Sequence, residues 1–384
     1  MRKVYIVGVG QTPVREHWDR SVRDLAVESM LLAMDEADRG GVDAIFVGNA
    51  LSGELTGQEQ IAALVADFAG QTGTEAVRVE AAGASGGAAV RLGYLAVASG
   101  IHDTVLVTGV EKMSDLPGPL VGEALVTSTD EEYEAIHGLS LDALYALLMH
   151  RYMHDYDLER RDFGHFSVNA HRNAVNNPHA MYRRPISVDA FERAKLVADP
   201  ISLLDSAPAA DGAASVILCS EQAAGDESGS CAEIIGSALA TDAVALHDRP
   251  NPLFLRAAHE SAREAYARAG VGPEDIDIFE LHDAFTILAA LSLEACGFAE
   301  EGRGAHLAME GEIALEGRIP ISTMGGLKAR GYPMGASGVY QIVELVQQLR
   351  GEAGANQVDA RLGMAQSIGG TGGTAVTHIL KSAQ

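Results

Sequence analysis

The sequence predicts an α/β protein built from two similar halves. Strand-like and helix-like segments alternate along most of the chain, and the order helix, short linker, strand, polar turn occurs twice. Alternation of this kind favours sheets whose faces are covered by helices. The chain has 384 residues, of which 47% are hydrophobic and only 5% aromatic. It is therefore long enough for two or three domains and can bury a large core.

The first half opens with a buried-strand pattern from Val4 to Val9. Residues 21–37 follow it with a helical stripe of small and apolar side chains. A strand over 42–49 then ends at a turn. The remaining expected elements of this half are a strand over 77–82, a glycine-rich turn over 83–87, a helix over 88–99 and a strand over 103–108.

The second half repeats this order. Residues 253–270 read as a helix, and 276–283 as a strand that runs into a polar turn. We expect a further strand over 319–323, a helix over 338–349 and a strand over 362–368. A repeat of this length indicates duplication of one supersecondary unit.

A different stretch, residues 115–200, interrupts the first half. It has no clean strand pattern and is richer in His, Tyr, Arg and Asn. Residues 213–220 look like the last strand of that half, and 225–230 read as a linker. We therefore expect an N-terminal half over 1–230, with 115–200 inserted, and a C-terminal half over 231–384.

Charge and cysteine usage exclude several classes of function. The formal net charge is −25, which argues against nucleic acid and anionic membranes as general partners. Cys219, Cys231 and Cys296 form no CxxC pair, so no metal site is expected. There is no signal-peptide pattern, no membrane-length apolar stretch and no nucleotide-binding glycine motif. We expect a soluble, cytoplasmic protein.

Five motifs carry a resemblance to a known family. They are the loop V-E-A-A-G-A-S-G-G at 79–87, D-G-A-A at 211–214, H-D-A-F at 282–285, G-G-L-K-A-R-G-Y-P at 325–333 and G-G-T-G-G at 369–373. In this order and spacing the chain resembles the thiolases, specifically their archaeal and sterol-carrier-type branch. The resemblance implies a duplicated five-layer α/β/α/β/α fold with an inserted loop domain. It also implies chemistry at the thioester of an acyl-CoA, which is substrate rather than a covalently bound cofactor.

The resemblance also shows what this chain lacks. Thiolases hold the acyl group on a cysteine at the start of a helix, where the helix N-terminus favours the thiolate. The matching position is Gly83, which has no side chain. Tyr332 stands where the family has its activating histidine, and a phenol with a pKa of about 10 is a poor base at neutral pH. Residues 363–367, where many thiolases place a second catalytic cysteine, contain no obvious base.

Three side chains remain as catalytic candidates, and each has a structural alternative. His282 matches a histidine that helps to hold the thioester oxygen, and is otherwise a histidine at a strand end. Ser85 is either a replacement nucleophile or, as we favour, a residue that caps the helix. Tyr332 either donates a hydrogen bond to a bound carbonyl or fills the empty histidine pocket. The resemblance places the oxyanion donors at the backbone of Gly83, Gly369 and Gly370.

Coenzyme A carries phosphates and needs local positive charge. The inserted stretch supplies Arg172, Arg183 and Arg184, and arginine binds phosphate through its planar fork of donors. Tyr182 is a candidate for packing the adenine or the pantetheine arm. The alternative is that these arginines balance neighbouring acidic residues.

We expect an acyl-CoA acyltransferase of thiolase type with an altered active site, working by direct transfer or through Ser85. The alternative is a non-catalytic CoA-binding or scaffold subunit, and a ketoacyl synthase is a third possibility. By resemblance the chain forms a homodimer or tetramer, and a small zinc-ribbon/OB-fold protein is a possible partner.

Overall fold

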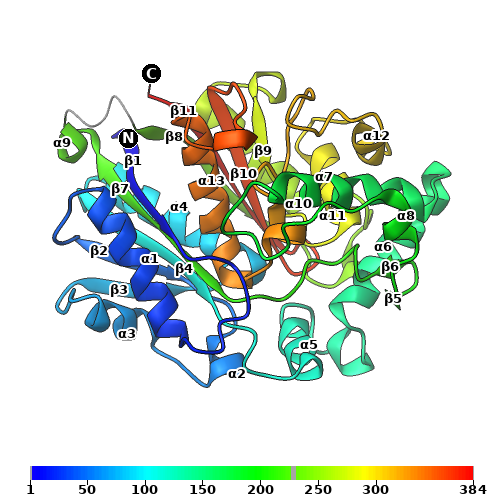
Figure 1. The fold of residues 1–384 in the computed structure, drawn as a ribbon, viewed down its shortest axis with the longest axis horizontal. Coiled ribbons are helices and arrows are strands. Elements are labelled where there is room, and N and C mark those ends of the chain that lie inside the picture. The colour runs from blue at the N-terminus through cyan, green and yellow to red at the C-terminus, as the bar shows by residue number, and fades with distance from the viewer. Residues whose placement is uncertain (1, 226–230, 384) are drawn as a thin grey trace.

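A nine-stranded sheet forms the framework of the computed structural model, which describes residues 2–225 and 231–383 (Figure 1). The strand order is β3-β2-β4-β7-β1-β8-β11-β10-β9. The strands are β1 (Val4–Gln11), β2 (Ala44–Gly48), β3 (Glu75–Val79), β4 (Thr104–Glu111), β7 (Gly212–Ser220), β8 (Ala232–Thr241), β9 (Ile278–Glu280), β10 (Leu362–Gly369) and β11 (Thr374–Ser382). Residues 226–230 of the expected linker lie outside the described residues.

The strand pairing confirms the duplicated architecture. From the centre outward, the first half runs β1, β7, β4, β2 and the second runs β8, β11, β10, β9. In both halves the first two pairings are antiparallel and the third is parallel. The halves meet where β1 pairs with β8, at Tyr5 opposite Glu233 and Ile6 opposite Ala232.

One expected strand was wrong. Residues 319–323 contribute a single parallel bridge, Ile321 to Phe279, instead of a strand matching β3. Ser322 has a φ of 48°, in the left-handed region, so the extended run ends there. Its carbonyl accepts a hydrogen bond from Gly325 N at 2.9 Å, which closes a turn.

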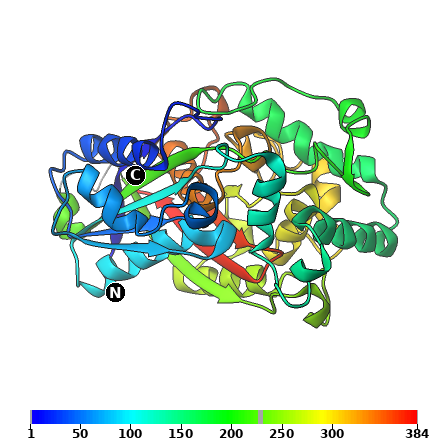
Figure 2. The same cartoon turned by 90° about the horizontal axis from the view of Figure 1, so that it is seen from below.

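Two central helices lie between the two halves of the sheet. α4 (Ser85–Ser99) and α13 (Ser337–Leu349) each contact strands of both halves (Figures 1 and 2). A side chain at Gly338 would collide with the backbone of Gly87, so glycine permits this close approach. On the outer faces, α1 (Val22–Glu36) packs on β1 and β7, α3 (Ile61–Phe68) on β3, and α10 (Arg256–Ala269) on β8 and β11. The layers are therefore α/β/α/β/α.

The interrupting region is mostly helical. It contains α5 (Gly118–Val126), α6 (Leu141–Tyr156), α7 (Gly164–Ala174) and α8 (Val188–Glu192), and the hairpin β5 (Leu196–Ala198)–β6 (Ile201–Ser202) closes it. α6 and α7 pack on α11 (Thr286–Ala295), which follows the H-D-A-F motif. Shorter helices are α2 (Ser52–Thr56), α9 (Glu221–Ala224) and α12 (Gly304–Met309). No helix among the described residues is both long and apolar enough to cross a membrane.

Candidate active site

Gly83 lies at the turn between β3 and the central helix α4. The turn is a short 3-10 helix, η1 (Ala82–Ala84), that leads directly into α4. Ala82 has a φ of 50°, which is uncommon for a residue with a side chain, and its N–H donates to the Glu80 carboxylate. Gly83 therefore sits at the N-terminus of α4, where free backbone N–H groups favour negative charge.

Three groups converge on Gly83. A Cβ placed on this glycine would lie 2.5 Å from the Ile368 carbonyl oxygen, 2.6 Å from the Tyr332 hydroxyl and 3.0 Å from Cε1 of His282. The His282 and Tyr332 rings meet edge to face, with centroids 5.4 Å apart. The structure thus brings together the three positions that the sequence singled out, and it fills the space that a side chain at position 83 would need.

His282 is held neutral by its surroundings. It follows β9, is only 2% exposed, and its Nδ1 has no hydrogen-bond partner within the described residues. Burial, and then the positive charge of Arg330, lower its pKa to about 3. A neutral imidazole carries one N–H, so His282 can donate a hydrogen bond but is a weak base.

Tyr332 is a protonated phenol at neutral pH. Burial, and then the neighbouring Tyr145 and Glu111, raise its pKa well above the ordinary value of 10.0. Its backbone is fixed by a 3.0 Å hydrogen bond from its N–H to the Pro208 carbonyl. Its hydroxyl can therefore act as a proton donor. The same oxygen can accept a proton only if the hydroxyl releases its own proton at the same time.

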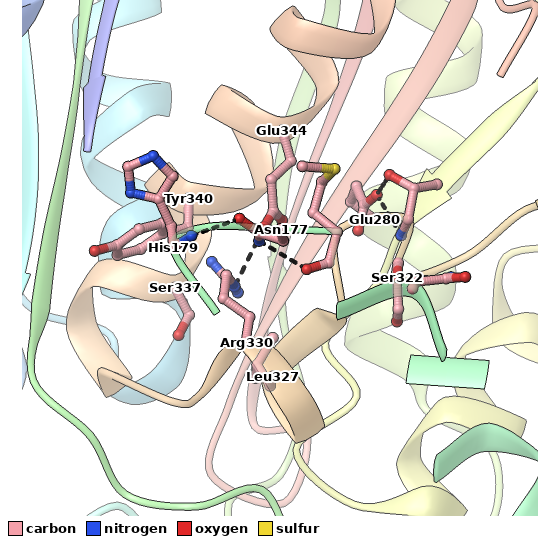
Figure 3. Close-up of polar contacts among 12 residues, drawn as sticks. Asn177, His179, Glu280, Ser322, Leu327, Arg330, Ser337, Tyr340 and Glu344 are labelled. Atoms are coloured by element: carbon pink, nitrogen blue, oxygen red, sulfur yellow. Dashed lines mark hydrogen bonds and ion pairs between the residues drawn. The ribbon is translucent and has the colours of Figure 1, made fainter. Parts of the chain in front are cut away.

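A buried ion pair supports the segment that leads to Tyr332 (Figure 3). Arg330 ends the π-helix η7 (Gly326–Arg330), and its Nε lies 3.3 Å from Oε1 of Glu344 on α13. Both side chains are almost completely buried, and the guanidinium carbon lies 4.7 Å from the centre of the Tyr340 ring. Asp283 accepts the Leu327 N–H at 2.7 Å. These contacts tie η7 to the residue that follows His282.

Ser85 hydrogen-bonds to the turn. Its Oγ donates to the Ala82 carbonyl at 2.6 Å and accepts the Ala81 N–H at 2.9 Å. Ser85 does not cap α4, whose N-cap is Ala84, and its hydroxyl instead satisfies polar groups of the preceding turn. This geometry favours a structural role in the turn, although not as a helix cap, over a nucleophile.

The glycine loop after β10 packs on the same turn. A Cβ on Gly369 would lie 2.5 Å from the Ala81 carbonyl, so this close approach requires glycine. Gly370 has a φ of 56°, and its carbonyl accepts the Tyr145 hydroxyl at 2.8 Å. Tyr145 in turn stacks on Phe285, with ring centroids 4.1 Å apart. Sequence reasoning missed Tyr145 because nothing in α6 distinguishes it from a core tyrosine.

The proposed CoA-binding arginines lie on the outside of η7. Arg172, Arg183 and Arg184 are exposed, and the Tyr182 ring is nearly parallel to that of His171, with centroids 6.1 Å apart. The Tyr182 N–H donates to the Ala329 carbonyl at 2.9 Å, which places this segment against η7.

Two cavities were not expected from the sequence, and the second of them adjoins the Gly83 turn. One, of about 360 Å³, has apolar walls formed largely by leucines of α6, with Arg151, Leu246 and His247 also lining it. It lies along the helix that carries Tyr145. The other, of about 260 Å³, is mainly polar and is lined by Ala82 and Met334, which are chain neighbours of Gly83 and Pro333. Among the residues that the structure describes, no cluster of His, Cys, Asp and Glu could hold a metal ion.

Comparison with known proteins identifies the family. The model of the thiolase N-terminal domain matches residues 4–222, and that of the thiolase C-terminal domain matches 238–382. An acetyl-CoA acetyltransferase from Methanothermobacter thermautotrophicus is 44% identical, over 99% of both chains. The benzoylsuccinyl-CoA thiolase subunit BbsB of Thauera aromatica is 33% identical, over 96% of this chain and 95% of its own. Among solved structures, an Ltp2-ChsH2(DUF35) aldolase has a TM-score of 0.86 at 26% identity, over 100% of this chain and 98% of its own. The chain belongs to the thiolase family.

Proposed function

We propose that this protein makes or breaks a carbon–carbon bond beside the thioester of an acyl-CoA without forming an acyl-enzyme at position 83. The observation that carries this proposal is the convergence of the Tyr332 hydroxyl, the His282 ring and the Ile368 carbonyl on Gly83. A cysteine would have no room there, and Ser85 is engaged in its turn. Chemistry that needs no protein nucleophile suits such a site best.

An aldol-type reaction meets this condition. In the cleavage direction, a 3-hydroxyacyl-CoA loses its hydroxyl proton to the Tyr332 oxygen, and the bond between the α- and β-carbons breaks. The β-carbon leaves as an aldehyde or ketone, and the bonding pair becomes the thioester enolate. Tyr332 passes its own proton to the enolate carbon, which gives a shorter acyl-CoA and a phenol unchanged overall. A phenol whose pKa is raised by burial suits this exchange, because no free phenolate is required.

His282 and the helix N-terminus would stabilise the enolate oxygen. A neutral imidazole donates one hydrogen bond, and preorganised donors in a water-poor site act strongly on developing negative charge. One solved relative is named an aldolase, which agrees with this reaction class.

Direct acyl transfer is the second candidate. Here the sulfur of a free CoA attacks the ketone of a 3-ketoacyl-CoA as its thiol proton passes to the Tyr332 oxygen, and the same carbon–carbon bond breaks. Tyr332 gives its own proton to the resulting enolate carbon, which leaves two acyl-CoA molecules. The 44% identity to an acetyl-CoA acetyltransferase favours it. The two reactions differ in substrate, because only transfer consumes free CoA.

Mass spectrometry and product analysis test the proposal together. We expect 3-hydroxyacyl-CoA to give a carbonyl product and a shorter acyl-CoA, with no acyl mass added to the protein. An adduct that disappears in Ser85→Ala would overturn the non-covalent mechanism. Turnover of 3-ketoacyl-CoA alone, dependent on free CoA, would select direct transfer.

For CoA itself, we propose that Arg183 and Arg184 hold the phosphates and that the apolar cavity beside α6 takes the pantetheine arm. An Arg183→Ala/Arg184→Ala variant should weaken CoA binding, measured by calorimetry. If Arg151→Ala at the cavity weakens binding instead, the phosphates lie on that side.

A role as a non-catalytic subunit is the remaining alternative. It is favoured by two relatives that are named as a subunit and as part of a two-protein aldolase. The predicted homodimer or tetramer and the small zinc-ribbon/OB-fold partner belong to this proposal, and β3 is an edge strand available for pairing. Absence of turnover both alone and with a co-purified partner, despite CoA binding, would support it.

A further inference from the structure

Glu111 is a buried carboxylate that accepts four hydrogen bonds near the site. It ends β4 and is fully buried. Oε1 accepts the Asn49 side-chain amide at 2.9 Å and the Leu51 N–H at 3.2 Å, and Oε2 accepts the Ala50 N–H at 2.9 Å and the Gly335 N–H at 3.0 Å. Both oxygens thus face donors only, an arrangement that an ionised carboxylate satisfies and an amide does not.

These bonds join two segments that are far apart in sequence. One is the loop 49–51 after β2, and the other is Gly335, three residues beyond Tyr332. A Cβ on Gly335 would lie 2.7 Å from Ala50 N and 2.7 Å from Oε2 of Glu111, so the two backbones are in direct contact. The Ala336 and Ser337 N–H groups both donate to the Pro333 carbonyl at 3.0 Å. Movement of Gly335 is therefore transmitted through a tight turn to Tyr332.

Arg78 holds the same loop from its other side. Its guanidinium donates to the Asn49 carbonyl at 3.1 Å, the Ala50 carbonyl at 2.6 Å and the Glu59 carboxylate at 2.7 Å. The loop thus gives the Ala50 and Leu51 N–H groups to Glu111, and the Asn49 and Ala50 carbonyl groups to Arg78. Arg78 and Met334 both line the polar cavity, so this network forms the wall between that cavity and Tyr332.

We infer that Glu111 is a positioning residue, which fixes the turn after Tyr332 so that the Tyr332 hydroxyl stays over Gly83. Its charge is opposed by Arg78 on β3 and faces the phenol of Tyr332, while the next residue, Lys112, pairs instead with Asp211 at 3.1 Å. Burial raises the pKa of Glu111 to about 7 against these hydrogen bonds. No step of the proposed reaction uses Glu111 itself.

The first test does not depend on activity. The protein is labelled with 3-fluorotyrosine, and the ¹⁹F signal of Tyr332 is assigned by its loss in Tyr332→Phe. We expect Glu111→Gln to shift this signal, and Glu264→Gln, the same chemical change at a partly exposed position of α10, to leave it in place. An unshifted signal in a folded Glu111→Gln protein would overturn the inference. If that variant fails to fold, Glu111→Asp, which keeps the charge but shortens the side chain, takes its place under the same criterion.

The second test rests on the proposed function. Glu111→Gln should lower kcat by at least about tenfold with KM changed less than about threefold, because it misplaces a reacting group rather than a binding group. In the Tyr332→Phe background, Glu111→Gln should not lower kcat any further. If the fold-losses in kcat of the two single variants multiply in the double variant, Glu111 has a general structural role instead. A wild-type protein without turnover would refute the proposed reaction, while the ¹⁹F result would still decide the positioning inference.

Discussion

Replacing Gly83 with alanine tests whether Tyr332 occupies the space that a side chain at position 83 would need. The new methyl group would meet the Tyr332 hydroxyl at 2.6 Å and the Ile368 carbonyl at 2.5 Å. Overpacking of this kind costs about 1–3 kcal/mol. Gly83 does not have a left-handed φ, so alanine also stabilises by about 0.4–1 kcal/mol through the unfolded chain. The net expectation is a loss of up to about 2.6 kcal/mol.

Tyr332→Phe removes one of these two close contacts. The cost of Gly83→Ala should therefore fall by about 1 kcal/mol in the Tyr332→Phe background, a coupling of the size seen for residues in contact. Thermal unfolding of the wild type, both single variants and the double variant measures this cycle. Gly122→Ala is the matched control, because its Cβ would meet nothing within 4 Å. Equal costs of Gly83→Ala in both backgrounds would refute the packing argument.

The remaining predictions concern catalysis, pH and the buried ion pair. Tyr332→Phe should lower turnover by about 10²–10⁴-fold, the range for loss of a positioned proton donor. Ser85→Ala should lower the unfolding temperature, because the Ala81 N–H and the Ala82 carbonyl lose their partner at a cost of about 1–3 kcal/mol, and should leave turnover within about threefold. Burial lowers the pKa of His378 from 6.5 to about 4. As pH falls, His378 therefore takes up its proton at a higher pH in the unfolded chain than in the folded protein. The wild type should therefore lose about 3 kcal/mol relative to His378→Gln between pH 6.5 and 4, measured by urea unfolding. Arg330→Met should destabilise by about 3–5 kcal/mol because it leaves Glu344 buried without a partner, and Arg330→Met/Glu344→Leu should recover most of this loss.

Much of the fold was predictable because each half repeats the same pattern. The strand at 4–9, the helix at 21–37 and the strand at 362–368 all appear in the structure close to their expected bounds. The failure at 319–323 has a local cause, since its apolar residues resemble a strand but Ser322 adopts a left-handed conformation. Side-chain periodicity does not report a single backbone dihedral of this kind, so the pattern could not reveal it.

The site was predictable where chemistry resides in motifs and unpredictable where it depends on packing. His282, Tyr332 and Gly83 lie in short motifs, and they meet in space. Glu111 and Tyr145 lie in an ordinary buried strand and an ordinary helix, and only the tertiary structure brings Glu111 to Gly335 and Tyr145 to Gly370. A carboxylate whose four donors come from residues 49–51 and 335 leaves no local signature, because its partners are up to 224 residues away.

Gly83 and Tyr332 form one structural unit rather than two independent positions. A cysteine at position 83 would collide with the present Tyr332 hydroxyl, so the glycine and the tyrosine are sterically matched. Burial keeps Tyr332 protonated and lowers the pKa of His282, so neither side chain is a strong base. What remains is a pair of groups, the Tyr332 hydroxyl and the Cε1 edge of the His282 ring, facing Gly83 at a helix N-terminus. Such a pair is suited to a bound carbonyl or enolate oxygen, which is why we place the reaction on the substrate's own carbon–carbon bond and not on the protein.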